Sequence, residues 1–580
     1  MAVEGWLRRP RLFAGQSKMD QMSMKHWGPI AGIAASGAYV ATAGYDNQLI
    51  LWDASSKRAI ARSQHDHLIN QCAFSAAGNL IATASSDYSA RVWDVPSLRL
   101  RAALIGHEDD VDMAVFSPDG TQIATCALDR TIRIWDLSGH CHGILRGHTG
   151  NILSVAWTRD GTRLVSSGVD GTVRVWDVGS GDKIECTDMG VRTDTIAITG
   201  DGRILAGDDL GRIALIADGT TCFTEAHRAG IKTIAFDEDT GTLITISYDR
   251  TIAVWSVGKA NGIHEVARAW LPAQIWARAA VLLRPGRVAM GTFGSGYAVF
   301  DWTANHWDLE EIEPDISLNA IAVVGKTRYA IGDAGILFRD GQPTAMVGSL
   351  CNFLLPAGRR LLTGGHMGRL HDAATGEMLF QHHSPLNCGT YFWRDDTPHV
   401  AIGTYTGEAL IFALDRDCLP RLVTILKIYE NAIKGLVAAG DRLFSVCAST
   451  DIAWHNTADF QLIRFAPNAH EKIANGCSLA GPSGFASIGR DLKLRIWTGN
   501  QEDVYPTPHP NSVKCICASN DRATLMTGAY TGTLAGFDVT SRQWVSFSRP
   551  TASGISGLAF DAANRRFLAS SYDGQIYAAA

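Results

Sequence analysis

Histidines paired with aspartates are the side chains of this sequence whose types and spacing could do chemistry. An imidazole held next to a carboxylate can take up and release protons during catalysis. Each of six aspartates follows a histidine by 20–22 residues and precedes a tryptophan by six residues. The sets are His26/Asp46/Trp52, His65/Asp87/Trp93, His107/Asp129/Trp135, His148/Asp170/Trp176, His227/Asp249/Trp255 and His470/Asp491/Trp497. Because the sets recur at one place in a repeat, we expect structural rather than catalytic roles for them.

The repeat places these sets on short antiparallel strands. The first four aspartates lie about 41 residues apart, and a period near 40 is typical of four-stranded blades arranged radially. In the clearest unit, from Gly106 to Gly139, alternating hydrophobic residues predict strands in VDMAVF, QIATCA and TIRIWD. The following segment, HCHGILRG, is expected to form the outer strand of the blade.

This unit resembles the WD40 repeat family. The resemblance rests on glycine–histidine pairs, such as Gly106-His107 and Gly147-His148, and on Trp-Asp dipeptides. The dipeptides are Trp52-Asp53, Trp93-Asp94, Trp135-Asp136 and Trp176-Asp177. The resemblance implies that a histidine, a strand hydroxyl, the turn aspartate and the tryptophan form a hydrogen-bonded chain within each blade.

Two blades are predicted to carry this structural tetrad in full. The tetrads are His65, Ser85, Asp87 and Trp93 in one blade, and His227, Ser247, Asp249 and Trp255 in the other. In other clear blades the expected hydroxyl position holds Ala127 or Gly168. We therefore expect the chain of hydrogen bonds to be broken there, or closed by water.

Recurring turns and strands predict an all-β fold of about fourteen blades, most simply two tandem seven-bladed WD40-type β-propellers. We assign residues 26–310 to the first propeller and 311–580 to the second. The last blade ends after its third strand, at YDGQIYAAA. Residues 1–25, through Trp6–Gly15 or Asp20–Lys25, are predicted to close the second ring by supplying the missing strand.

Composition excludes several classes of partner. The 580 residues carry a formal net charge of −6, and the pI near 6.3 gives no reason to expect nucleic-acid binding. We find no apolar stretch long enough to cross a bilayer, so no membrane association is expected. The twelve cysteines are scattered without a CxxC pair, which favours reduced thiols and a cytoplasmic location.

Few other residues suggest a cofactor or a metal ion. The His140-Cys141-His142 and His382-His383 segments could be read as metal ligands. Neighbouring residues on a strand face opposite sides, so we expect neither segment to bind a metal. We find no HExxH, Walker-type or GxSxG motif, and we predict no catalytic residue and no cofactor.

Residues just before the turn aspartate should project onto the wide face, where the family commonly binds partners. Tyrosine is frequent at these positions, and it suits protein recognition, although it could instead pack over a neighbouring turn. Residues at the start of the inner strands share this face, and the acidic run Glu108–Asp112 could hold a basic partner segment or form a solvated loop. The partner-binding candidates are Tyr45, Asn70, Asp110, Asp112, Asn151, Tyr248, Tyr405, Tyr530 and Tyr572.

The favoured function is a non-catalytic scaffold that binds proteins or peptides through the propeller faces and the cleft between the rings. One alternative is an accessory or maturation factor for enzymes of a bacterial biosynthetic or conflict pathway. Another is an enzyme with its site in a propeller channel, which would need titratable groups converging at inner-strand ends; we find too few. Tryptophans crowd the seventh blade, where they could form a seam or a ligand pocket: Trp270, Trp276, Trp302 and Trp307.

Overall fold

The computed structural model describes residues 24–26, 28–258, 262–272, 274–284, 286–310, 312, 317–551 and 553–579. These residues form fifty-five strands in fourteen antiparallel sheets, thirteen with four strands and one with three. Each sheet is a simple meander of consecutive strands. The all-β fold of four-stranded blades predicted from the repeat is therefore confirmed.

The third sheet shows why these residues form a blade. It contains β9 (Val111–Phe116), β10 (Gln122–Ala127), β11 (Thr131–Asp136) and β12 (Cys141–Arg146). β10 and β11 are largely buried, because other sheets cover both of their faces, whereas β12 alternates towards solvent. The turn between β10 and β11 puts Arg130 at a φ of 65°, the left-handed conformation that a tight hairpin turn requires.

The sheets close into two rings through their innermost strands. In the first ring, neighbouring inner strands pack in chain order and the first packs back on the seventh. They are β1 (Ile30–Ser36), β5 (Ile69–Phe74), β9, β13 (Ile152–Trp157), β17 (Thr193–Ile198), β21 (Ile231–Asp237) and β25 (Ile275–Arg284).

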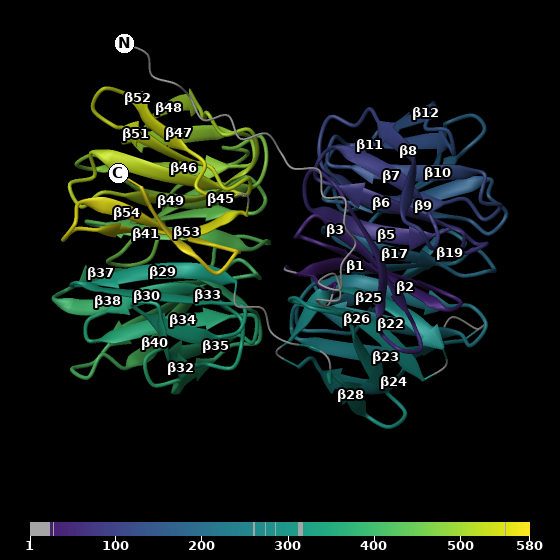
Figure 1. Cartoon of the computed structure of the whole chain (residues 1–580), viewed down its shortest axis with the longest axis horizontal. Helices are drawn as coiled ribbons and strands as arrows, with labels where there is room; N and C mark the ends of the chain where they lie inside the picture. The colour runs from purple at the N-terminus through teal and green to yellow at the C-terminus, as the bar shows by residue number, and fades with distance from the viewer. Residues whose placement is uncertain are drawn as a thin grey trace, which may run out of the picture.

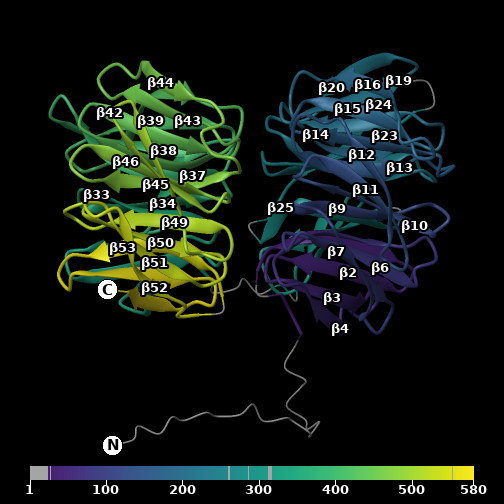
Figure 2. The same cartoon turned by 90° about the horizontal axis from the view of Figure 1, so that it is seen from above.

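The second ring closes in the same way, with its first inner strand packed on its last. Its inner strands are β29 (Leu318–Val324), β33 (Cys351–Ala357), β37 (Leu386–Arg394), β41 (Ile433–Ala439), β45 (Ala474–Ala480), β49 (Val513–Ala518) and β53 (Ile555–Asp561). Two views at right angles show the rings as discs standing side by side (Figures 1 and 2).

The last sheet is the three-stranded one. It contains β53, β54 (Arg566–Ser571) and β55 (Ile576–Ala579), with β55 at the edge. The segment predicted to supply a fourth strand lies outside the described residues, apart from Met24 and Lys25. The described chain then joins the first ring at His26, whose N–H donates to the carbonyl of Ser295 at 2.8 Å.

Hydrophobic layers between neighbouring sheets form the core. Trp135, Trp176 and Trp497 are the largest fully buried side chains, and each lies on the third strand of its sheet. Burial of this size is the main source of stability, because apolar area removed from water contributes roughly 25 cal/mol per Å². None of the described residues form a helix with the length and hydropathy needed to cross a membrane.

Candidate functional site

The paired histidines and aspartates are used in hydrogen-bonded relays inside the blades. In the third sheet, His107 Nδ1 lies 2.8 Å from Asp129 Oδ2, and His107 Nε2 lies 2.7 Å from Thr125 Oγ1. The indole N–H of Trp135 donates to the same hydroxyl at 2.8 Å. One threonine hydroxyl therefore connects the imidazole to the indole, as the family resemblance implies.

The predicted relay hydroxyls, Ser85 and Ser247, are wrong by two residues. Thr83 Oγ1 lies 2.7 Å from His65 Nε2 and accepts the Trp93 N–H at 2.8 Å. Ser85 instead donates to the carbonyl of Leu68 at 2.9 Å. Residues two apart on a strand face the same side, so sequence alternation alone could not separate the two hydroxyls.

The same shift corrects the other blades. Thr245 takes the place predicted for Ser247, which donates to the Ala229 carbonyl. The blades predicted to be broken at Ala127 and Gly168 are complete through Thr125 and Ser166. All six sets form a relay, and the bridging hydroxyls are Thr42, Thr83, Thr125, Ser166, Thr245 and Ser487.

Burial and hydrogen-bond partners together set the pKa values of two relay groups, His65 and Asp249. Burial lowers the pKa of His65, and the hydrogen bond and charge of Asp87 only partly offset this effect. Burial alone would raise the pKa of Asp249, but its contacts with His227, the Thr251 hydroxyl and the Arg228 N–H outweigh this effect and hold the pKa at about 2. In each relay the imidazole and the carboxylate hold two turns together, which suits a structural role.

The predicted partner-binding tyrosines lie between the two rings. Tyr248 of the first ring packs edge-on against Tyr405 of the second, with ring centroids 5.2 Å apart. Tyr530 packs against His67 across the same interface at 6.3 Å, and Tyr572 stacks on Tyr530 at 6.4 Å. The prediction that these tyrosines contact an external partner is therefore wrong, because the faces that carry them face each other.

The acidic run also meets a basic segment, but one from the same chain. Lys472 Nζ donates to Asp109 Oδ1 at 2.8 Å, and Arg490 donates to Asp110 Oδ2 at 2.8 Å. The second ring thus pairs with Asp109 and Asp110 of this run, so the prediction that Asp110 contacts an external partner is wrong.

The remaining candidates lie within the first ring. Asn70 donates to the carbonyl of Val111 at 2.9 Å, and Tyr45 packs on Trp276 at 4.9 Å. Asp112 faces Arg278 at 3.7 Å, and burial raises the pKa of Asp112 to about 6. Asn151 is half-buried before β13, and its carbonyl accepts the N–H of Val169.

Titratable groups do converge at the inner-strand ends, contrary to the sequence expectation. Lys232, on β21, bonds to the carboxylates of Asp194 and Asp209. In the second ring, Lys434 lies 5.1 Å above the ring of Tyr405, and burial lowers its pKa to about 7, helped by the charge of Lys514. The partners of Lys232 and of Lys434 lie 23 to 80 residues from these lysines in the sequence, so no local motif reveals them.

The lysines of the second ring replace an asparagine that recurs in other blades. The amides of Asn352, Asn387 and Asn475 each donate to a carbonyl of the next inner strand, at 2.6–2.8 Å. Lys434 and Lys514 occupy the corresponding second position of β41 and β49. A comparison of inner strands by position would have revealed this pattern from the sequence.

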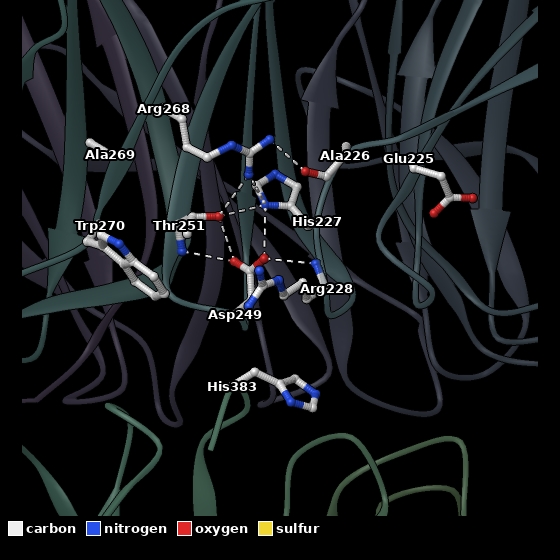
Figure 3. A pocket seen from close by; sticks show the side chains of 10 residues that line it. All are labelled: Glu225, Ala226, His227, Arg228, Asp249, Thr251, Arg268, Ala269, Trp270 and His383. Atoms are coloured by element: carbon white, nitrogen blue, oxygen red, sulfur yellow. Dashed lines mark hydrogen bonds and ion pairs between the residues drawn. The ribbon is translucent and has the colours of Figure 1, made fainter. Parts of the chain in front are cut away.

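A cavity of about 550 Å³ opens between the rings. Figure 3 shows relay residues His227 and Asp249 on one side, with Trp270 next to them and His383 of the second ring opposite. Arg268 is fixed here, because its guanidinium donates to the Ala226 carbonyl at 2.7 Å and to Glu265. The lining residues are Glu225, Ala226, His227, Arg228, Asp249, Thr251, Arg268, Ala269, Trp270 and His383.

Three tryptophans of the seventh-blade region lie in three different places. Trp276 is buried with Phe293 and with Leu350 of the second ring, so it belongs to the seam. Trp307 stacks on Phe300 inside the first ring at 4.4 Å. Trp270 ends β24 (Ile263–Trp270) and lines the cavity.

Blades with His–hydroxyl–Trp relays define a β-propeller of WD type. The family model for the WD domain, G-beta repeat, matches residues 59–94, 98–136, 139–177 and 219–256. Four WD40 repeats are thus detected in the first ring, which is consistent with the WD40-repeat β-propeller family, whose members generally act as protein-interaction scaffolds and are typically non-catalytic. A search of curated proteins found no match to the chain.

Proposed function

We propose that this chain is a non-catalytic scaffold that binds a protein segment in the cleft between its two rings. The observation that carries the proposal is Trp270, which is 67% exposed at the rim of the cavity. Large aromatic side chains in such a position are typical anchors of protein interfaces, because they bury much apolar area on binding.

The cavity suits an extended segment with an apolar side chain and both kinds of charge. Trp270 offers the apolar contact, while Glu225 and Arg228 offer charges of opposite sign. Trp270 also lies on β24, the edge strand of the sheet β21-β22-β23-β24. An extended peptide could pair with the backbone of such an edge.

The relay next to the cavity supports this role by keeping the wall rigid. His227 and Asp249 are nearly inaccessible, and the Asp249 carboxylate accepts the N–H of Arg228 at 2.9 Å. A preformed wall loses little conformational entropy when a partner binds.

Replacement of the anchor tests the proposal. Partners captured from a native lysate by the wild-type chain should be lost, at least tenfold, with Trp270→Ala. Trp393→Ala is the matched control, because Trp393 is 60% exposed on β37 and does not line the cavity. Equal recovery of partners by all three proteins would reject the cleft as the docking site.

We also propose that the chain works in the cytoplasm and binds neither nucleic acid nor membranes. The twelve cysteines all lie in described residues, and all are free thiols. Burial raises the pKa of Cys72 to about 12, which makes this thiol unreactive. Such thiols suit a reducing compartment.

We retain the division into residues 26–310 and 311–580 as a proposal. The last strand of the first ring is β28 (His306–Asp308), and the second ring begins with β29 at Leu318. Residues 1–25 remain the proposed source of the fourth strand beside β55, since that sheet has three strands in the described chain.

A further inference from the structure

In one blade of the second ring, a histidine occupies the relay position but its relay partners are replaced by other residues. The N–H of His382 donates to the carbonyl of Gly368 at 2.8 Å, as the N–H of His227 does to Gly211 at 2.9 Å. His382 thus occupies the relay position in front of the sheet that begins with β37.

The partners of a relay are missing from this sheet. It includes β38 (Thr397–Thr404) and β39 (Glu408–Leu414), and their register places Ile402 where other blades have the bridging hydroxyl. Phe412 stands at the tryptophan position, and Thr406 stands at that of the turn aspartate. His382 therefore cannot serve the structural role of its counterparts, and its presence calls for another explanation.

Two other ligand-type side chains meet His382. His382 Nε2 lies 3.5 Å from Glu408 Oε2, and His383 Nε2 lies 3.9 Å from the same oxygen. The imidazole centroids are 4.1 Å apart. The sequence argument that these histidines point apart is wrong, because they lie in the loop after β36 (Met378–Gln381) and not within a strand.

The spacing fits one metal ion. One ligand atom from each of the three residues can be chosen so that all lie within 4.8 Å of one another. Ligand atoms of a tetrahedral zinc site are separated by about 3.3–3.5 Å, given Zn–N and Zn–O distances near 2.1 Å. The two imidazole–carboxylate distances, 3.5 and 3.9 Å, lie close to this range, and side-chain rotation would have to close a gap of at most about 1.5 Å between the two imidazole nitrogens.

Neighbouring groups orient two of the three ligands. The hydroxyl of Thr406 donates to Glu408 Oε2 at 2.8 Å. His382 Nδ1 lies 3.2 Å from the N–H of Ser384, which donates to it, and 3.4 Å from the carbonyl of the same residue. Metal binding through Nε2 would use the tautomer in which Nδ1 donates to this carbonyl. Such outer contacts commonly set the tautomer of a metal-binding histidine.

We propose that His382, His383 and Glu408 bind a divalent transition-metal ion of the zinc class at the edge of the cavity between the rings. Two imidazoles and one carboxylate favour such an ion over Mg²⁺ or Ca²⁺, which prefer oxygen ligands. His382 is only 7% exposed, so its imidazole is shielded from solvent next to the other two ligands. His383 lines the cavity, so a fourth coordination position can be reached from there.

The proposal is tested on the full-length chain after chelation and dialysis. Titration calorimetry with Zn²⁺ should show one site, and Co²⁺ should give the strong visible absorption of a four-coordinate complex. Glu408→Gln and His383→Ala should each weaken Zn²⁺ binding at least tenfold and remove the Co²⁺ band.

His142→Ala is the matched control, because His142 pairs with Asp136 at 3.5 Å and lies next to His140 on an outer edge. This variant should bind like the wild type. Circular dichroism and thermal melting, measured without metal, establish that each variant is folded. Absence of stoichiometric binding by the wild type, or unchanged binding by folded Glu408→Gln and His383→Ala, would overturn the proposal.

Discussion

The two rings share one architecture but hold their blades together differently. Among the described residues, five relays lie in the first ring and one, around His470, lies in the second. The second ring uses other pairs at the same place, such as the hydroxyl of Tyr429 next to Ser445 Oγ at 2.8 Å. Both rings close, so the relay strengthens a blade without being required for the fold.

The difference between the rings also indicates where a functional site can form. In the first ring, each relay histidine is committed to an aspartate and a hydroxyl. In the second ring, His382 has lost these partners and meets His383 and Glu408 instead. Degenerate repeats of a propeller are therefore better places to search for function than regular ones.

The largest expected effect comes from removing matching histidines in the two rings. His107→Leu leaves the Asp129 carboxylate buried without its partner, which should lower the free energy of unfolding by about 3 kcal/mol. His382→Leu, measured with a chelator present, should cost less than about 1 kcal/mol, because Glu408 is partly solvated. Urea unfolding followed by tryptophan fluorescence measures both. Equal losses would contradict the difference between the rings.

A smaller effect is expected from deleting residues 1–25. If this segment pairs with β55, its loss removes several backbone hydrogen bonds, each worth about 0.5–1.5 kcal/mol, and should destabilise the second ring by about 2 kcal/mol. Hydrogen exchange should then increase in β53–β55 and stay unchanged in β9–β12. Unchanged exchange in β53–β55 would show that these residues do not close the sheet.

The smallest effect, when measured over a single pH unit, concerns the buried lysine of the second ring. Because the pKa of Lys434 is lowered to about 7, between pH 7 and about 10 the unfolded chain holds a proton that the folded chain has released. Stability should therefore rise with pH in this window, by at most about 1.4 kcal/mol per pH unit.

Lys434→Met should remove this contribution, so the difference in unfolding free energy between variant and wild type should shrink as pH rises. Lys183→Met, on an outer strand and exposed, is the control and should show no such trend. A difference that stays constant from pH 7 to 10 would mean that Lys434 keeps its ordinary pKa.

Much of the fold could be predicted, because strand alternation and turn residues are local signals. The register of the relay could not: Thr83 and Ser85 lie two residues apart on one face, and only the packed tryptophan distinguishes them. The contacts of the tyrosines could not be predicted either, because they depend on how two rings distant in sequence meet. The convergence of His382 and His383 depends on a loop conformation that alternation cannot predict.

The first matched repeat, residues 59–94, begins with β4 (Ala59–Gln64), the outer strand of the first sheet, and continues with three strands of the next sheet. One sequence repeat thus contributes strands to two neighbouring blades. A pulling force applied to such a unit is shared by both sheets, and neither can peel away without dragging on the other. Mechanical strength in this ring should therefore be collective, with several blades yielding in one event.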